Sequence, residues 1–203
     1  MPDADLPQIY LITPDRFEPA SFGDRLAGVL DGREVGCVRM TTGGLDPDTV
    51  MRMADHLRGI CHGRDVALVL EAHTALVPQL GLDGVHLPPG DAVRDARKQL
   101  GKDSIVGAGC GTSRHAGMTA GEAGADYVSF GPMSIDPRLG KDPADVDLIR
   151  WWSEMIEVPS VAEGGLGHTL IDALTPVADF LAFGEEIWST DDPLRELNRL
   201  LAP

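Results

Sequence analysis

The sequence is short of cysteine, of basic residues and of long apolar runs, and each shortage excludes a class of protein. Its 203 residues include three cysteines, Cys37, Cys61 and Cys110, without C-x-x-C spacing, which is typical of reduced thiols in a cytoplasm. The 17 Lys and Arg residues stand against 32 Asp and Glu, so no basic stripe exists to bind nucleic acid. No apolar run reaches the roughly 18 residues of a membrane span, and no secretory signal is visible. We therefore expect a cytoplasmic protein with no nucleic acid and no membrane as partner.

The apolar residues fall instead into eight short runs. The apolar share of 43% is ordinary for a globular protein, and 203 residues are enough for one domain with a substantial core. Short runs of buried character that end in turn-forming residues are typical of strands in a covered sheet. We predict strands at Gln8–Thr13, Val35–Met40, Ala67–Glu71, Gly84–Leu87, Ile105–Gly109, Tyr127–Gly131, Ser160–Glu163 and Asp179–Gly184.

The stretches between these runs carry apolar residues at helical intervals. Such spacing predicts helices over Thr49–Cys61, Asp91–Leu100, Leu148–Ile156 and Leu194–Leu201, with Asp91 as a candidate N-cap. Strict alternation of strands and helices predicts a parallel sheet with right-handed crossovers. Eight such units predict an α/β fold, a single-domain (β/α)8 TIM barrel over residues 1–203. The alternative is an open doubly wound sheet. That fold would require a glycine-rich fingerprint after the first strand, and the sequence has none at that position.

Three longer segments begin like buried strands and then stop on histidine, proline or glycine rather than on a cluster of solvated charges. They are Leu82–Asp91, Gly124–Pro132 and Val158–Gly167. In a barrel the carboxyl ends of all strands open onto one face, and active sites are built there. The sequence therefore predicts a site formed by these strand ends and by the loops that follow them.

Four segments carry a family resemblance that runs nearly from end to end. They read IYLITPD (Ile9–Asp15), LGLDGVHL (Leu80–Leu87), GADYVSFGP (Gly124–Pro132) and PSVAEGGL (Pro159–Leu166). Together they resemble the thiamine phosphate synthase family, which also contains the thiazole tautomerases. The resemblance implies a barrel that joins a pyrimidine methyl diphosphate to a thiazole phosphate, with loss of pyrophosphate and assistance from Mg²⁺.

The resemblance also implies roles for individual residues at the strand ends. A diphosphate leaving group needs cations, Mg²⁺ needs hard oxygen ligands, and the phosphate of a second substrate needs backbone N–H donors. The expected residues are, for catalysis, Arg39, His86, Arg138 and Lys141; for substrate and phosphate binding, Gly131, Pro132, Gly164, Gly165 and Gly184; and for Mg²⁺, Asp91 and Glu71.

The chain departs from the family pattern at several of these strand ends. Ala72 stands where the family has a metal-binding aspartate, and Thr41 replaces a lysine. Where the family completes its phosphate cup with a serine, the chain has Gly184 followed by Glu185 and Glu186. A carboxylate that faces the cup would oppose a phosphate dianion. We therefore expect weak Mg²⁺ binding and weak binding of the thiazole phosphate.

Three functional hypotheses remain open on these residues. The chain is a divergent thiamine phosphate synthase, a relative with another small-molecule task such as a tautomerase, or a non-catalytic barrel. For a tautomerase, His115 is the nearest histidine after the fifth strand, although an exposed helix position is the simpler explanation of it. Cys110 is either a candidate nucleophilic thiol or an inert packed residue. Trp151 and Trp152 indicate core packing or a homodimer interface.

Overall fold

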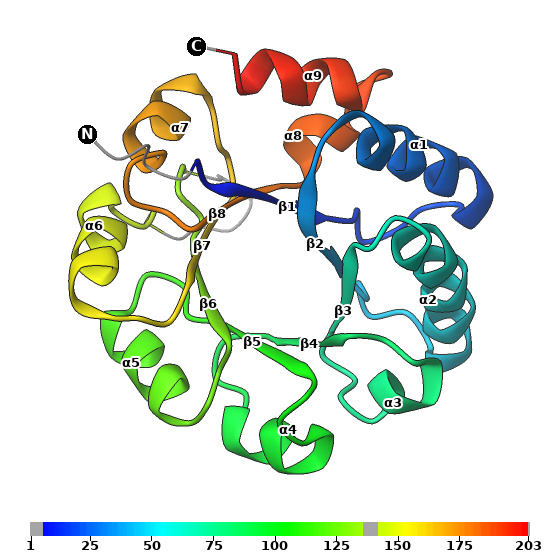
Figure 1. The fold of residues 1–203 in the computed structure, drawn as a ribbon, viewed down its shortest axis with the longest axis horizontal. Coiled ribbons are helices and arrows are strands. Elements are labelled where there is room, and N and C mark those ends of the chain that lie inside the picture. Colours follow the sequence, from blue (N-terminus) through cyan, green and yellow to red (C-terminus); the bar gives the residue numbers. More distant parts are fainter. Residues whose placement is uncertain (1–5, 136–141, 203) are drawn as a thin grey trace.

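The chain forms a closed barrel of eight parallel strands in sequential order, with the helices around it (Figure 1). The computed structural model describes residues 6–135 and 142–202. The predicted TIM barrel is therefore confirmed, and the open sheet is wrong because β8 pairs with β1 and closes the ring. The strands are β1 (Gln8–Ile12), β2 (Val35–Met40), β3 (Ala67–Glu71), β4 (Gly84–Leu87), β5 (Ile105–Gly109), β6 (Tyr127–Phe130), β7 (Ser160–Glu163) and β8 (Phe180–Phe183).

Helices follow the strands and form the outer layer of the barrel (Figure 1). No helix within residues 6–135 and 142–202 combines the length and apolar character needed to cross a membrane. They are α1 (Pro19–Gly32), α2 (Pro47–His62), α3 (Leu76–Leu80), α4 (Val93–Leu100), α5 (Arg114–Glu122), α6 (Val146–Met155), α7 (His168–Leu174), α8 (Glu185–Trp188) and α9 (Pro193–Leu200).

Side-chain caps explain where most of the longer helices begin. Asp46 accepts a hydrogen bond from the Thr49 N–H at the start of α2, and Ser113 accepts one from the Ala116 N–H at the start of α5. Each cap satisfies a backbone donor that a helix otherwise leaves unpaired. The helix predicted from Asp91 begins later, at Val93, with Ala92 at the N-cap position and no side-chain cap. The prediction that Asp91 caps this helix is therefore wrong.

The core has two parts, one on each side of the strand ring. The larger part packs the outward-facing strand residues against the helices and includes Trp152, which is fully buried. Trp151 on the same helix is half-buried and lies under the Arg114 guanidinium, so both tryptophans have packing contacts within the chain. The smaller part fills the barrel interior with Tyr10, Cys37, Val69, Tyr127, Val161 and Ala182.

Three aspartates tie neighbouring strands together at the amino end of the barrel. Asp83, Asp126 and Asp179 precede β4, β6 and β8, and each accepts a hydrogen bond from a backbone N–H at the start of the preceding strand. For Asp126 this donor is the Val106 N–H, at 2.7 Å. This end lies opposite the carboxyl ends of the strands. In TIM barrels the amino end contributes to stability, and active sites lie at the carboxyl end.

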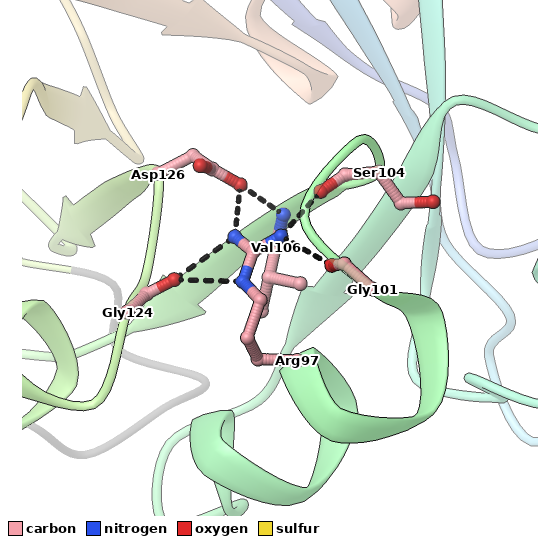
Figure 2. Close-up of polar contacts among 6 residues, drawn as sticks. All are labelled: Arg97, Gly101, Ser104, Val106, Gly124 and Asp126. Carbon is pink, nitrogen blue, oxygen red and sulfur yellow. Dashed lines mark hydrogen bonds and ion pairs between the residues drawn. The ribbon is translucent and has the colours of Figure 1, made fainter.

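Arg97 of α4 reinforces the same end of the barrel (Figure 2). Its guanidinium donates to the carbonyl oxygens of Gly101, Ser104 and Gly124 and pairs with the Asp126 carboxylate. The five donors of one planar group thus join the loops that enter β5 and β6. The sequence did not predict these contacts of Arg97. They lie away from the carboxyl ends of the strands, which indicates a structural role for Arg97.

Candidate active site

A cavity of about 620 Å³ opens at the carboxyl ends of the strands. It contains six of the residues expected from the sequence, contributed by β2, β3, β4 and the loops after β6 and β7. The strand ends therefore converge as a barrel requires. The lining residues are Ile12, Arg39, Glu71, His86, Pro88, Pro89, Gly109, Gly111, Thr112, Gly131, Pro132, Asp142, Glu163 and Gly164.

Arg39 is the cation at the floor of this cavity. It is 7% exposed, and its Nη1 atom lies 2.8 Å from Glu163 Oε2. The oxygen stands off the direction of the N–H bonds, so the contact is an ion pair rather than an aligned hydrogen bond. Burial opposes the charge on Arg39, but Glu163 together with the smaller contributions of Tyr10, Tyr127 and Glu71 outweighs burial, and the pKa of Arg39 is raised. Arg39 is therefore permanently charged and held in one place.

His86 contacts the same guanidinium nitrogen of Arg39 as Glu163 does. Arg39 Nη1 donates to His86 Nε2 at 2.8 Å, so Nδ1 carries the ring proton and donates to the Tyr127 hydroxyl at 2.9 Å. The Tyr127 and Tyr10 hydroxyls lie 2.7 Å apart. Burial, with Arg39 nearby, holds the pKa of His86 well below its usual value, and burial raises the pKa of both tyrosines. His86, Tyr127 and Tyr10 are therefore uncharged, and the neutral His86 ring positions Arg39.

This placement of His86 predicts a pH dependence of stability. Its folded pKa lies below its unfolded value of 6.5, so below that pH only the unfolded chain binds the extra proton. The stability is therefore unaffected above about pH 6.5 and falls below it, by up to about 1.4 kcal/mol per pH unit from this group. Urea unfolding of the wild type and of His86→Gln between about pH 7.5 and 5.5 measures the difference in slope.

The exposed His115 provides the control for that measurement. His115→Gln should follow the wild-type slope, because the His115 side chain is exposed and its loss leaves the buried His86 contacts intact. Equal slopes for the wild type and His86→Gln would contradict a buried neutral His86.

Among the described residues, three carboxylates line the cavity: Glu71, Asp142 and Glu163. Glu163 is engaged with Arg39, whereas Glu71 accepts one long hydrogen bond, 3.4 Å, from the Thr42 N–H. Within the described ranges no group of three or more His, Cys, Asp or Glu side chains is placed to hold a metal. Mg²⁺ commonly takes one or two carboxylates and completes its shell with water and substrate phosphates. Glu71 fits that kind of shared site, but the described residues do not form a complete protein cage.

Several expected residues lie outside this cavity. Asp91 is exposed and lines a separate cavity of about 700 Å³, together with Cys110 and His115. Asp91 and Glu71 are therefore not brought together. Burial, with a smaller contribution from Glu163, raises the pKa of Cys110 to about 12, which makes it a packed thiol rather than a nucleophile. Arg138 and Lys141 lie outside the described residues.

The loops after β7 and β8 are joined by a carboxylate. Glu186 Oε1 accepts from the Gly165 N–H at 2.6 Å and the Leu166 N–H at 3.3 Å, and its Oε2 accepts from the Gly184 N–H at 2.7 Å. We call these three donors the N–H cluster. Glu185 is exposed and lines a different cavity, beside Phe17 and Trp188. Of the two glutamates after β8, Glu186 is therefore the one that faces the glycine-rich strand end.

The sequence reading missed the polar groups below the cavity floor. Tyr10, Tyr127 and Ser129 are buried, and the Ser129 hydroxyl and the Arg39 Nε–H have no partner among the described residues. The available signal was the alternation of β6, which places Tyr127 and Ser129 on the same face of one strand.

A closed (β/α)8 barrel with a polar cavity at its strand ends and a fixed buried cation defines the class of barrel enzymes. A family model described as "Thiamine monophosphate synthase" matches residues 9–187. The chain belongs to this family, and it is an enzyme.

Similar proteins agree with this assignment. The chain is 41% identical to a thiamine-phosphate synthase of Rhodospirillum centenum, over 90% of this chain and 89% of that protein. It is 38% identical to a thiamine-phosphate synthase of Erythrobacter litoralis, over 95% and 93%. Among solved structures, a thiamine phosphate pyrophosphorylase from Pyrococcus furiosus superposes with a TM-score of 0.78 at 22% identity, over 96% and 97% of the two chains, which supports the fold.

Proposed function

We propose that this enzyme is a thiamine-phosphate synthase, which joins a pyrimidine methyl diphosphate to a thiazole phosphate and releases pyrophosphate. Family membership over residues 9–187 is the observation that carries the proposal. In the reaction the ring nitrogen of the thiazole forms a bond to the pyrimidine methylene carbon. The carbon–oxygen bond to the diphosphate breaks, and its electron pair leaves with the pyrophosphate.

Arg39 is placed to stabilise the charge that develops on this leaving group. It is fixed before the ligand arrives by Glu163 and His86, so little reorganisation is needed as the carbon–oxygen bond breaks. One of its N–H groups, at Nε, has no acceptor among the described residues. The cavity of about 620 Å³ is within the range that small-molecule sites occupy.

We propose Glu71 as the residue that holds Mg²⁺ when the diphosphate is bound. A bound Mg²⁺ would neutralise charge on the diphosphate oxygens. Because Glu71 offers a single carboxylate at the cavity wall, binding should depend on the ligand. Asp91 has no part in this proposal, since it lines another cavity.

Glu71→Gln tests this assignment by calorimetry. For the wild type we expect no saturable Mg²⁺ binding below roughly millimolar concentration without ligand, and clear binding when pyrophosphate is present. Glu71→Gln should weaken the pyrophosphate-dependent binding by about tenfold or more, because a carboxylate ligand is lost. Asp91→Asn serves as the matched control and should leave this binding unchanged. Tight binding abolished by Asp91→Asn instead would contradict the assignment.

Nothing in the described residues favours the tautomerase alternative. Its candidate His115 is exposed and lines a cavity other than the one that contains Arg39. We further propose a cytoplasmic location, supported by three free cysteines that are all buried. The homodimer stays a prediction.

A growth assay tests the proposed function in a cell. Expression of the chain in a bacterial strain that lacks its own thiamine-phosphate synthase should restore growth without added thiamine. Failure to restore growth by a folded, expressed protein would contradict the proposal.

A further inference from the structure

Glu186 occupies a position where the protein offers hydrogen-bond donors to an anion. Its two carboxylate oxygens take the three donors of the N–H cluster, which come from the loops after β7 and β8. The loops after the seventh and eighth strands are a frequent phosphate-binding place in TIM barrels. In this protein the anion bound between these two loops is the chain's own Glu186 carboxylate.

The loop after β7 is shaped by glycines. Gly164 and Gly165 have φ values of 86° and 74°, in the left-handed region that favours glycine. A Cβ atom on Gly165 would lie 1.7 Å from the Ser134 Oγ, so no side chain fits there. The backbone of this loop is therefore not covered by a side chain of its own at Gly165, and the Gly165 and Leu166 N–H groups reach the Glu186 carboxylate. Gly164 lines the cavity that contains Arg39.

Among the described residues, the charges around the cavity do not offset the carboxylate. Arg39 is engaged with Glu163, and Glu71 and Asp142 add further negative charge to the lining. Glu186 is half-buried, so its interaction with an incoming dianion would be screened less than that of a fully exposed group. A carboxylate and a phosphate cannot share the same three donors.

We propose that Glu186 is a tethered competitor for the phosphate of the substrate and determines how strongly the enzyme prefers a phosphorylated thiazole over the free alcohol. This inference rests on the proposed function. The substrate phosphate binds the N–H cluster only after the Glu186 carboxylate leaves it. The residue therefore lowers the affinity for the phosphate and reduces the penalty for a substrate that lacks one.

The first test measures binding of inorganic phosphate by calorimetry, which needs no turnover. Glu186→Ala exposes the N–H cluster, and Glu186→Gln removes the charge while it keeps an acceptor. We expect both variants to bind inorganic phosphate about tenfold more tightly than the wild type, with the larger gain for Glu186→Ala. The matched control is Glu185→Gln, which removes the same charge from the neighbouring residue that faces away.

The second test measures steady-state kinetics with the thiazole phosphate and with the thiazole alcohol. Glu186→Ala should lower the KM for the thiazole phosphate by about tenfold and leave the KM for the pyrimidine diphosphate unchanged. The ratio of kcat/KM between phosphate and alcohol should rise accordingly. Circular dichroism and thermal unfolding establish that the variants are folded.

The outcomes separate this inference from the proposed function. Phosphate affinity that is unchanged or lower in both folded Glu186 variants would overturn the inference and leave Glu186 as a clasp between two loops. An equal gain in Glu185→Gln would also overturn it, because the effect would then be one of net charge. A wild-type protein that binds phosphate as expected but turns over neither thiazole would contradict the proposed function alone.

Discussion

Replacement of Arg39 by methionine is expected to lower kcat/KM by about a thousandfold or more, because the fixed cation at the leaving group is lost. Methionine keeps most of the buried volume, so the lost charge dominates. The same change leaves the Glu163 carboxylate without its partner at the cavity floor. We therefore also expect the free energy of unfolding to fall by about 2–4 kcal/mol. Steady-state kinetics and urea unfolding measure the two effects.

The double variant Arg39→Met/Glu163→Gln separates these effects. The neutral amide removes the unpaired charge, so most of the lost stability should return, whereas the activity should not. Recovery of activity in the double variant would contradict the role of Arg39. A single variant that keeps more than about a tenth of wild-type kcat/KM would contradict it as well.

Gly107→Ala is expected to cost about 3 kcal/mol of stability, because an added methyl group collides with a buried ring. A Cβ atom at Gly107 would lie 2.0 Å from Tyr127 Cζ and 2.3 Å from its hydroxyl oxygen. The Tyr127 ring would have to move, and its hydrogen bonds to His86 and Tyr10 would be broken. His86 would then lose its support, so the activity should fall together with the stability.

Gly28→Ala is the matched control for this change. Gly28 lies in helix α1, and a Cβ atom there would meet nothing within 4 Å. It should be neutral or stabilising, by up to about 1 kcal/mol, since alanine restricts the unfolded chain more than glycine. Urea unfolding of the two variants gives the comparison. A Gly107→Ala protein as stable as Gly28→Ala would mean that the barrel interior is not packed as described.

The alternation of short apolar runs with helical stretches explains why the fold was predictable. Each of the eight runs became a strand, because buried parallel strands read as short apolar segments whatever their tertiary context. The predicted ends of β1, β6 and β8 extended one residue too far, at Thr13, Gly131 and Gly184. At those points the loop after each strand begins, and local composition does not reveal the last residue of the strand.

The site was predictable only in part, because the local sequence does not determine the direction in which a loop residue points. Arg39, Glu71 and His86 stand at strand ends, and the barrel brings all strand ends together. Asp91 lies several residues beyond its strand, so the loop, not the strand, decides where it goes. Glu185 and Glu186 are adjacent glutamates, and only the course of the turn after β8 determines that Glu186 reaches the N–H cluster.

The most direct test of the account is the reaction itself, followed by mass spectrometry with the pyrimidine methyl diphosphate, the thiazole phosphate and Mg²⁺. The account predicts thiamine phosphate and pyrophosphate in equal amounts from the wild type, with either substrate alone giving no thiamine phosphate. Arg39→Met should give about a thousandfold less product under the same conditions. A folded wild-type protein that forms no thiamine phosphate, or an Arg39→Met protein that forms it at the wild-type rate, would contradict the account.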